Sequence, residues 1–132
     1  MMAVAVPVAA LALMAAQRPA ALAQTAPGLW EIAGLPGAKA PARECVADVI
    51  ALAQFEHRRK NCQRSVLKDG PSSTVIHYSC PGNEFGRSTM TVITPRSLRI
   101  ETQGISDNLP FAYVLQARRV GECTAGQTAS RH

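Results

Sequence analysis

The sequence predicts a mainly β fold of the α+β type: a curved antiparallel meander of about six or seven strands, with one short helix and two disulfides. First, apolar and polar residues alternate with period two between turn signals over most of the second half of the chain. Second, only residues 46–57 have a helical period. Third, the chain of 132 residues has an even number of cysteines, four.

The first expected strand is 28–32, GLWEI, which holds the only tryptophan of the chain. Alternation places Trp30 on one face of this strand and Glu31 on the other. An indole buries more apolar area than other side chains, so Trp30 is predicted to be a structural anchor in the core rather than a ligand-binding residue. Glu31, on the opposite face, is expected to pair with an arginine such as Arg118 or Arg119.

A loop rich in Gly and Pro, 33–41, and a short strand, 42–46, lead to the one expected helix, 47–57. Its apolar residues recur at i, i+3, i+4 and i+7, which predicts an amphipathic helix with Asp48 in its first turn. A basic cluster is typical of a solvated helix end, and the alternative is a patch for an anionic partner. The cluster at the end of this helix consists of His57, Arg58, Arg59 and Lys60.

After residue 61 the pattern is that of strands joined by turns. The sequence DGPS at 69–72 predicts one hairpin turn, and PRS at 95–97 predicts a second. In the arm after the second turn, apolar and polar residues alternate cleanly, as expected for a sheet with one face in the core and one in water. The strands expected in this half of the chain are 62–68, 73–80, 87–94, 98–105 and 111–123.

Residues 1–23 have the pattern of a secretory signal peptide. The apolar, uncharged run from Ala3 to Ala16 is too short to span a bilayer comfortably, and the small residues around Leu22 form an A-x-A cleavage pattern. Cleavage is therefore expected between Ala23 and Gln24. The alternatives are an N-terminal membrane anchor and a buried apolar helix that is never removed.

The expected mature chain is a single sheet-rich domain, 24–123, followed by a tail, 124–132, whose small polar residues predict disorder. No second apolar run is long enough to span a membrane. The protein is therefore expected to be periplasmic or secreted. The formal charge of +5 comes from basic residues interleaved with acids, which indicates ordinary solubility, and together with export it argues against a nucleic-acid partner.

All four cysteines follow the expected cleavage site, which favours two disulfides. They are separated by 16, 17 and 42 residues, so there is no close chelating pair for a metal. The favoured pairing of the three that four cysteines allow is Cys45–Cys62 with Cys80–Cys123. The rival joins Cys62 to Cys80 and Cys45 to Cys123. A tight first hairpin places Cys62 opposite Ser79, so the rival needs a bulge or an odd-length loop.

The sequence contains no recognisable catalytic constellation. The histidines that could act as bases are His57, His77 and His132, and no G-x-S-x-G or comparable turn presents a nucleophile. His77 lies in an expected strand, where a histidine side chain is usually hydrogen-bonded or exposed. There is no phosphate-binding glycine loop, dinucleotide fingerprint or calcium loop, so no cofactor and no metal are predicted. The chain is expected not to be an enzyme.

Several features occur in a fixed order: GLWE at 28–31, Cys45 before a helix, YSC at 78–80 and RVGEC at 119–123. With the four cysteines, this order resembles the small exported bacterial proteins grouped as domain of unknown function family 3617. The likeness runs from Pro27 to Cys123 and so covers nearly all of the expected mature chain. The resemblance implies an exported, disulfide-bonded, sheet-rich domain, and it brings no known activity, cofactor or catalytic residue.

Two classes of function remain. The favoured class is a non-catalytic interaction or structural module of the cell envelope, which docks on another exported protein. The alternative is a small binding protein that holds an apolar ligand or a peptide on the concave face of its sheet. Aromatic residues make up only 5% of the chain, which argues against a large aromatic-lined cavity. The expected partner is an unidentified exported protein or a small apolar ligand.

Overall fold

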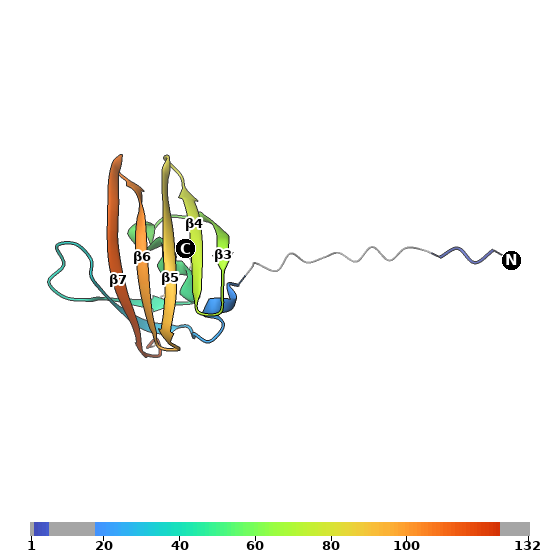
Figure 1. Cartoon of the computed structure of the whole chain (residues 1–132), viewed down its shortest axis with the longest axis horizontal. Coiled ribbons are helices and arrows are strands. Elements are labelled where there is room, and N and C mark those ends of the chain that lie inside the picture. The colour runs from blue at the N-terminus through green and yellow to red at the C-terminus, as the bar shows by residue number, and fades with distance from the viewer. Residues whose placement is uncertain (1, 6–17, 125–132) are drawn as a thin grey trace.

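The computed structural model describes residues 2–5 and 18–124. It confirms the mainly β fold: seven antiparallel strands form one curved sheet, and a helix lies against one face of it (Figure 1). The two helical segments, both of the 3-10 type, are η1 (Ala20–Leu22) and η2 (Val49–His57). The strands are β1 (Gly28–Ala33), β2 (Ala42–Val46), β3 (Gln63–Asp69), β4 (Ser73–Cys80), β5 (Glu84–Thr94), β6 (Ser97–Ser106) and β7 (Leu109–Gly121).

The order of the strands in the sheet is β2-β1-β7-β6-β5-β4-β3. From β3 to β7 each strand pairs with the next along the chain, which is the expected meander. The strands β1 and β2 depart from a simple meander, because β1 pairs with β2 on one side and with β7 on the other. This pairing places the first strand of the domain beside the last and extends the sheet around η2.

The helix η2 differs from the expected amphipathic helix over 47–57. It begins at Val49, and Asp48 is its N-cap rather than part of its first turn: the Asp48 carboxylate accepts the Ile50 N–H at 3.2 Å. The backbone leaves helical geometry at Gln54 (φ −107°, ψ 36°), which divides the segment. Every residue of η2 except Glu56 is buried, because the sheet curves around the helix, so η2 has no solvent-facing stripe.

The core lies between η2 and the inward face of the sheet. Trp30 has an exposed fraction of 0%, and its Nε1–H donates to the Ala26 carbonyl at 3.1 Å, so the indole is buried with its polar atom satisfied. Leu52 and Phe55 of η2 belong to the same apolar cluster. Burying each side chain of this size contributes about 1.5–3 kcal/mol. The other large apolar residues that the sheet buries completely include Ile32, Ile76, Met90, Ile100 and Leu115.

The disulfides of the structure are Cys45–Cys123 and Cys62–Cys80, so the pairing favoured from the sequence is wrong. In the β3–β4 hairpin the register shifts at Leu67, which bulges out of the pairing. The bulge places Ser79 opposite Gln63 rather than opposite Cys62. The next position along the hairpin therefore brings Cys62 to Cys80, with a Cα–Cα distance of 4.2 Å.

The strand order explains why the favoured bridge Cys80–Cys123 does not form. The strands β4 and β7 are separated by β5 and β6, and three strand spacings amount to about 14 Å, whereas a disulfide spans at most about 7 Å between Cα atoms. The strand β2 is separated from β7 by β1 alone. Cys45 on β2 and Cys123 just after β7 lie 5.6 Å apart and bridge across the end of β1.

Candidate functional site

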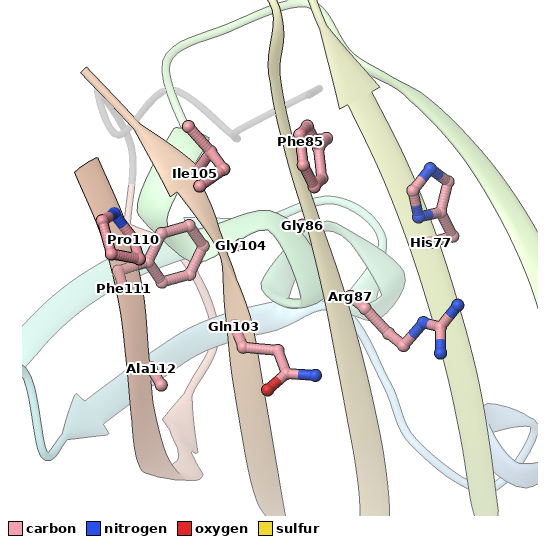
Figure 2. Close-up of a pocket in the computed structure, with 10 residues that line it drawn as sticks. All are labelled: His77, Phe85, Gly86, Arg87, Gln103, Gly104, Ile105, Pro110, Phe111 and Ala112. Carbon is pink, nitrogen blue, oxygen red and sulfur yellow. The ribbon is translucent and has the colours of Figure 1, made fainter. Parts of the chain in front are cut away.

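The face of the sheet turned away from η2, which we call the outer face, carries a hollow of about 610 Å³ (Figure 2). Four neighbouring strands, β4 to β7, line it. All of them belong to one sheet, so the hollow has a floor but no second layer that closes over it. The residues that line it are His77, Phe85, Gly86, Arg87, Gln103, Gly104, Ile105, Pro110, Phe111 and Ala112.

One end of the hollow is apolar because three residues share a row across the sheet. In the register of the strands, Phe85 lies opposite Ile105, and Ile105 lies opposite Pro110. Phe85 is 44% exposed, and its ring lies 6.5 Å, centroid to centroid, from the His77 ring. Phe85 and Pro110 are exposed and Ile105 is half-buried. Accessible apolar side chains gathered in one row are typical of a contact surface rather than of a solvated sheet face.

The middle of the hollow is cationic. Arg87 lies in the next row, opposite His77 on β4 and Gln103 on β6. Its guanidinium has no ion-pair partner within the part of the chain that the structure describes. Glu101, one row further on, already forms an ion pair with Arg99, with 2.5 Å between the guanidinium nitrogen and the carboxylate oxygen. Arg87 is therefore available to a carboxylate from another molecule.

A second hollow of about 430 Å³ continues the first along the outer face. The two share Arg87, Gln103 and Ala112, and the second runs on to Glu101 and Val114. Ala112 is the smallest side chain in its row, so the floor stays low where the two hollows meet. We call the two hollows together the outer-face groove: it is apolar at one end, cationic in the middle and polar at the other end.

A second cluster of interest is buried under the inner face and centres on His57. Its Nδ1 lies 2.9 Å from the Tyr78 hydroxyl, and its Nε2 lies 3.2 Å from a Glu84 carboxylate oxygen. The side chains of His57 and Glu84 are only 1% and 8% exposed. Glu84 also accepts hydrogen bonds from the Lys60 ammonium and, at 3.1 Å, from the Asp107 backbone N–H. We call these residues the buried polar cluster.

Position 86 explains how this cluster is packed. Tyr78 and Gly86 are register partners, and a Cβ on Gly86 would overlap the Tyr78 ring. The absence of a side chain therefore lets the Tyr78 ring lie across β5 and reach His57, whose ring it meets edge-on with centroids 5.4 Å apart. A glycine at this position is thus a packing requirement rather than a turn signal.

The charges in the buried polar cluster follow from its surroundings. The Lys60 hydrogen bond, followed by that of the Asp107 N–H, lowers the pKa of Glu84, so this residue is a carboxylate at neutral pH. Burial raises the pKa of Tyr78, so its hydroxyl stays protonated. Burial and the hydrogen bond to Glu56 likewise raise the pKa of Tyr113.

A carboxylate, an imidazole and a hydroxyl in sequence are the elements of a nucleophilic triad, and Glu84, His57 and Tyr78 lie in that order. Catalysis would require the hydroxyl to reach a substrate. Tyr78 is 0% exposed, and none of the hollows described above is lined by it or by His57. The contacts of this cluster tie the end of η2 to β4 and β5.

The structure does not gather the four basic residues after the helix into one patch. His57 is buried, as described above. Arg58 stacks over the Phe55 ring at 4.4 Å and lies 3.3 Å from Glu44, while Lys60 pairs with Glu84. Arg59 is exposed. The sequence alone does not indicate the carboxylate partners, because Glu44 lies on β2 and Glu84 on β5.

The remaining residues singled out in the sequence are found as follows. Glu31 pairs with Arg43 at 3.2 Å and with Arg118 at 3.4 Å on the outer face. The expected cleavage bond, Ala23–Gln24, directly follows η1, which is docked on the domain. His132 and the expected tail beyond Thr124 lie outside the described residues, as do residues 1 and 6–17 of the expected signal peptide.

Within residues 2–5 and 18–124, no three His, Cys, Asp or Glu side chains are grouped as a metal ion would require. The same part of the chain contains no helix with the length and apolar character to cross a membrane. Comparison of the chain with protein-family models, with curated proteins and with solved structures finds no match. The resemblance to domain of unknown function family 3617 stays a prediction from the sequence.

Proposed function

We propose that this chain is an exported, non-catalytic interaction module, and that it docks on another exported protein through the outer-face groove. The observation that carries the proposal is the juxtaposition of an apolar row, formed by Phe85, Ile105 and Pro110, with the unpaired Arg87 on an uncovered sheet face. A surface of this kind fits a partner that presents an apolar side chain beside a carboxylate. Membership of domain of unknown function family 3617 is part of the same proposal.

Export is supported by the two disulfides, which are stable in an oxidising compartment, and by the signal-like pattern of residues 1–23. We infer from these two features that the protein works in the periplasm or outside the cell, after cleavage between Ala23 and Gln24. A nucleic-acid partner is not expected there.

The alternative function, a carrier for a small apolar ligand, has less support. The concave face on which such a ligand was expected is filled by η2 and its apolar side chains, such as Leu52 and Phe55. The outer-face groove has the volume of a small-molecule site, but sites for such ligands bury most of the ligand surface. One sheet without a covering layer buries only one side of a bound molecule.

The test begins with a photo-crosslinking amino acid in place of Gln103, inside the groove, in the protein expressed with its own export signal. The same amino acid in place of the exposed Arg59, outside the groove, is the control. We expect one protein to be crosslinked from position 103 and not from position 59. That protein is then purified, and its affinity for the wild-type chain is measured by calorimetry.

In the purified system, Arg87→Glu should weaken binding at least about tenfold, because it replaces an attraction to a carboxylate with a repulsion. Arg96→Glu changes the net charge equally, lies in the exposed turn between β5 and β6, and should leave the affinity within about twofold. Equal losses in both variants would reduce the effect to net charge and refute the groove as the docking surface. A lipid or metabolite bound at full occupancy in native mass spectrometry would favour the carrier.

A further inference from the structure

The short helix η1 is docked on the domain although it immediately precedes the expected cleavage bond. Ala21 is fully buried, and Leu22, 8% exposed, belongs to the same apolar cluster as Trp30 and Val49. The segment is thus packed as part of the core, and Figure 1 shows it seated at the end of the sheet, near the turn that joins β3 to β4.

A single carboxylate holds the backbone of this segment. Asp69, the last residue of β3, accepts the Ala20 N–H at 2.6 Å and the Ala21 N–H at 3.3 Å. Hydrogen bonds from backbone donors to a carboxylate recognise a peptide in this conformation whatever its side chains are. The apolar side chain that follows, Leu22, packs into the core cluster beside these hydrogen bonds.

A hollow of about 250 Å³ lies directly beside the segment. One of its walls consists of η1 and its flanking residues, and the opposite wall includes Pro27, Ala47 and Val49. Removal of the segment would join this hollow to the space of the Leu22 side chain. The domain would then have an apolar groove with the Asp69 carboxylate at one end. This carboxylate would have lost the two backbone N–H groups, those of Ala20 and Ala21, that donate to it.

We infer that cleavage between Ala23 and Gln24 creates a peptide-binding groove, which the chain's own leader fills until then. The inference rests on the export and cleavage in the proposed function. The occupant in the mature protein is a segment of another exported protein that has the chemistry of the leader: two small residues with free backbone N–H groups, followed by a side chain of the size of leucine. The leader is therefore an intramolecular competitor for this groove.

The test uses the full chain and the peptide RPAALA, with the sequence of residues 18–23 and both ends blocked, labelled for fluorescence anisotropy. The wild-type full chain should not bind the peptide, because the tethered segment is present at an effective concentration of the order of millimolar. Leu22→Asp in the full chain expels the tethered segment, because a carboxylate is not tolerated in the apolar cluster. This variant should bind the peptide saturably.

Two further measurements keep the test decisive. Ala20→Pro removes the N–H that Asp69 accepts at 2.6 Å and leaves Leu22 in place, so it should also open the groove and does not depend on a charged core residue. Adding Asp69→Ala to Leu22→Asp should weaken peptide binding by about tenfold or more. A peptide in which Leu is replaced by Asp should not bind to any of these chains.

Saturable binding to the opened variants, and not to the wild type, supports the inference. If Leu22→Asp and Ala20→Pro both stay folded and neither binds the peptide, there is no groove and the inference is overturned. The intact mass of the exported protein tests cleavage separately. A mature chain that still contains residues 18–23 would contradict the export proposal as stated, while leaving the binding result on the full chain unaffected.

Discussion

Glu84 is the residue that holds the buried polar cluster together, because Lys60, His57 and the Asp107 N–H all converge on its carboxylate. The hydrogen bonds from Lys60 and from the Asp107 N–H lower its pKa in the folded state below the unfolded value of about 4.3. The unfolded chain therefore binds the proton more tightly. The stabilisation is present above the unfolded pKa and is lost as the pH falls through the folded pKa.

We predict that Glu84→Gln lowers the stability at pH 7 and flattens its loss on acidification below about pH 5. Urea unfolding midpoints, measured between about pH 2.5 and pH 7, give the comparison. Glu101→Gln is the matched control, because Glu101 also pairs with a basic side chain, that of Arg99, but is half exposed. A Glu84→Gln variant that loses as much stability as the wild type between pH 5 and pH 3 would place the acid sensitivity elsewhere.

Trp30 lies on the first strand, between β2 and β7, and supplies the largest buried side chain of the sheet. We predict that Trp30→Ala destabilises the domain by about 3–5 kcal/mol, because it leaves a cavity in the core and an unpaired Ala26 carbonyl. Thermal unfolding followed by circular dichroism measures the change. Val114→Ala, on the exposed outer face, is the control. A stable, well-folded Trp30→Ala variant that loses only partner binding would contradict the core role.

At the scale of elements, strand β5 shows where sequence patterns lose information. The alternation predicts a strand from residue 87, whereas β5 begins at Glu84. The inward positions at its start are Glu84 and Gly86, which carry no apolar signal. Their partners, Tyr78 and His57, come from other elements, so the burial of these polar groups could not be read locally. The strands β4 and β6, in contrast, alternate regularly over most of their length and were predicted from the hairpin turns and their period.

The pairing of β4 with β5 leaves no room for a side chain at Gly86. A Cβ there would lie 2.4 Å from the Tyr78 ring, which is held in place by η2. We predict that Gly86→Ala destabilises the domain by about 1–3 kcal/mol through overpacking. Thermal unfolding gives the value, with Gly121→Ala as control, since a Cβ at position 121 meets nothing within 4 Å. Because Gly→Ala at an open position tends to stabilise by lowering the entropy of the unfolded chain, a Gly86→Ala variant as stable as Gly121→Ala would contradict the role of the Tyr78 contact.

At the scale of the whole molecule, the sequence predicts the fold class but not the order of the strands. Nothing local in GLWEI indicates that β1 lies between β2 and β7, because that pairing joins residues about 90 positions apart and depends on how the sheet curves around η2. The outer-face groove is hidden in the sequence for the same reason. Its residues come from four strands and become neighbours only through the register.

The disulfides follow from the same long-range arrangement and differ in what they constrain. Cys62–Cys80 closes a short loop, with a sequence separation of 18, inside one hairpin. Cys45–Cys123 has a separation of 78 and ties the two ends of the domain across β1. In the chain-entropy model, the short loop stabilises the fold by about 3 kcal/mol and the long one by about 4.5 kcal/mol, because the longer loop restricts the unfolded chain more.

We therefore predict that the double variant Cys45→Ala/Cys123→Ala loses about 1 kcal/mol more stability than Cys62→Ala/Cys80→Ala. Urea unfolding of both variants and of the wild type, without reductant, measures the difference. Peptide mapping of the unreduced wild-type protein provides the control for the pairing itself. The opposite ranking would mean that the hairpin bridge contributes chiefly through the native state, by fixing the register of β3 and β4 next to the buried polar cluster, rather than by restricting the unfolded chain.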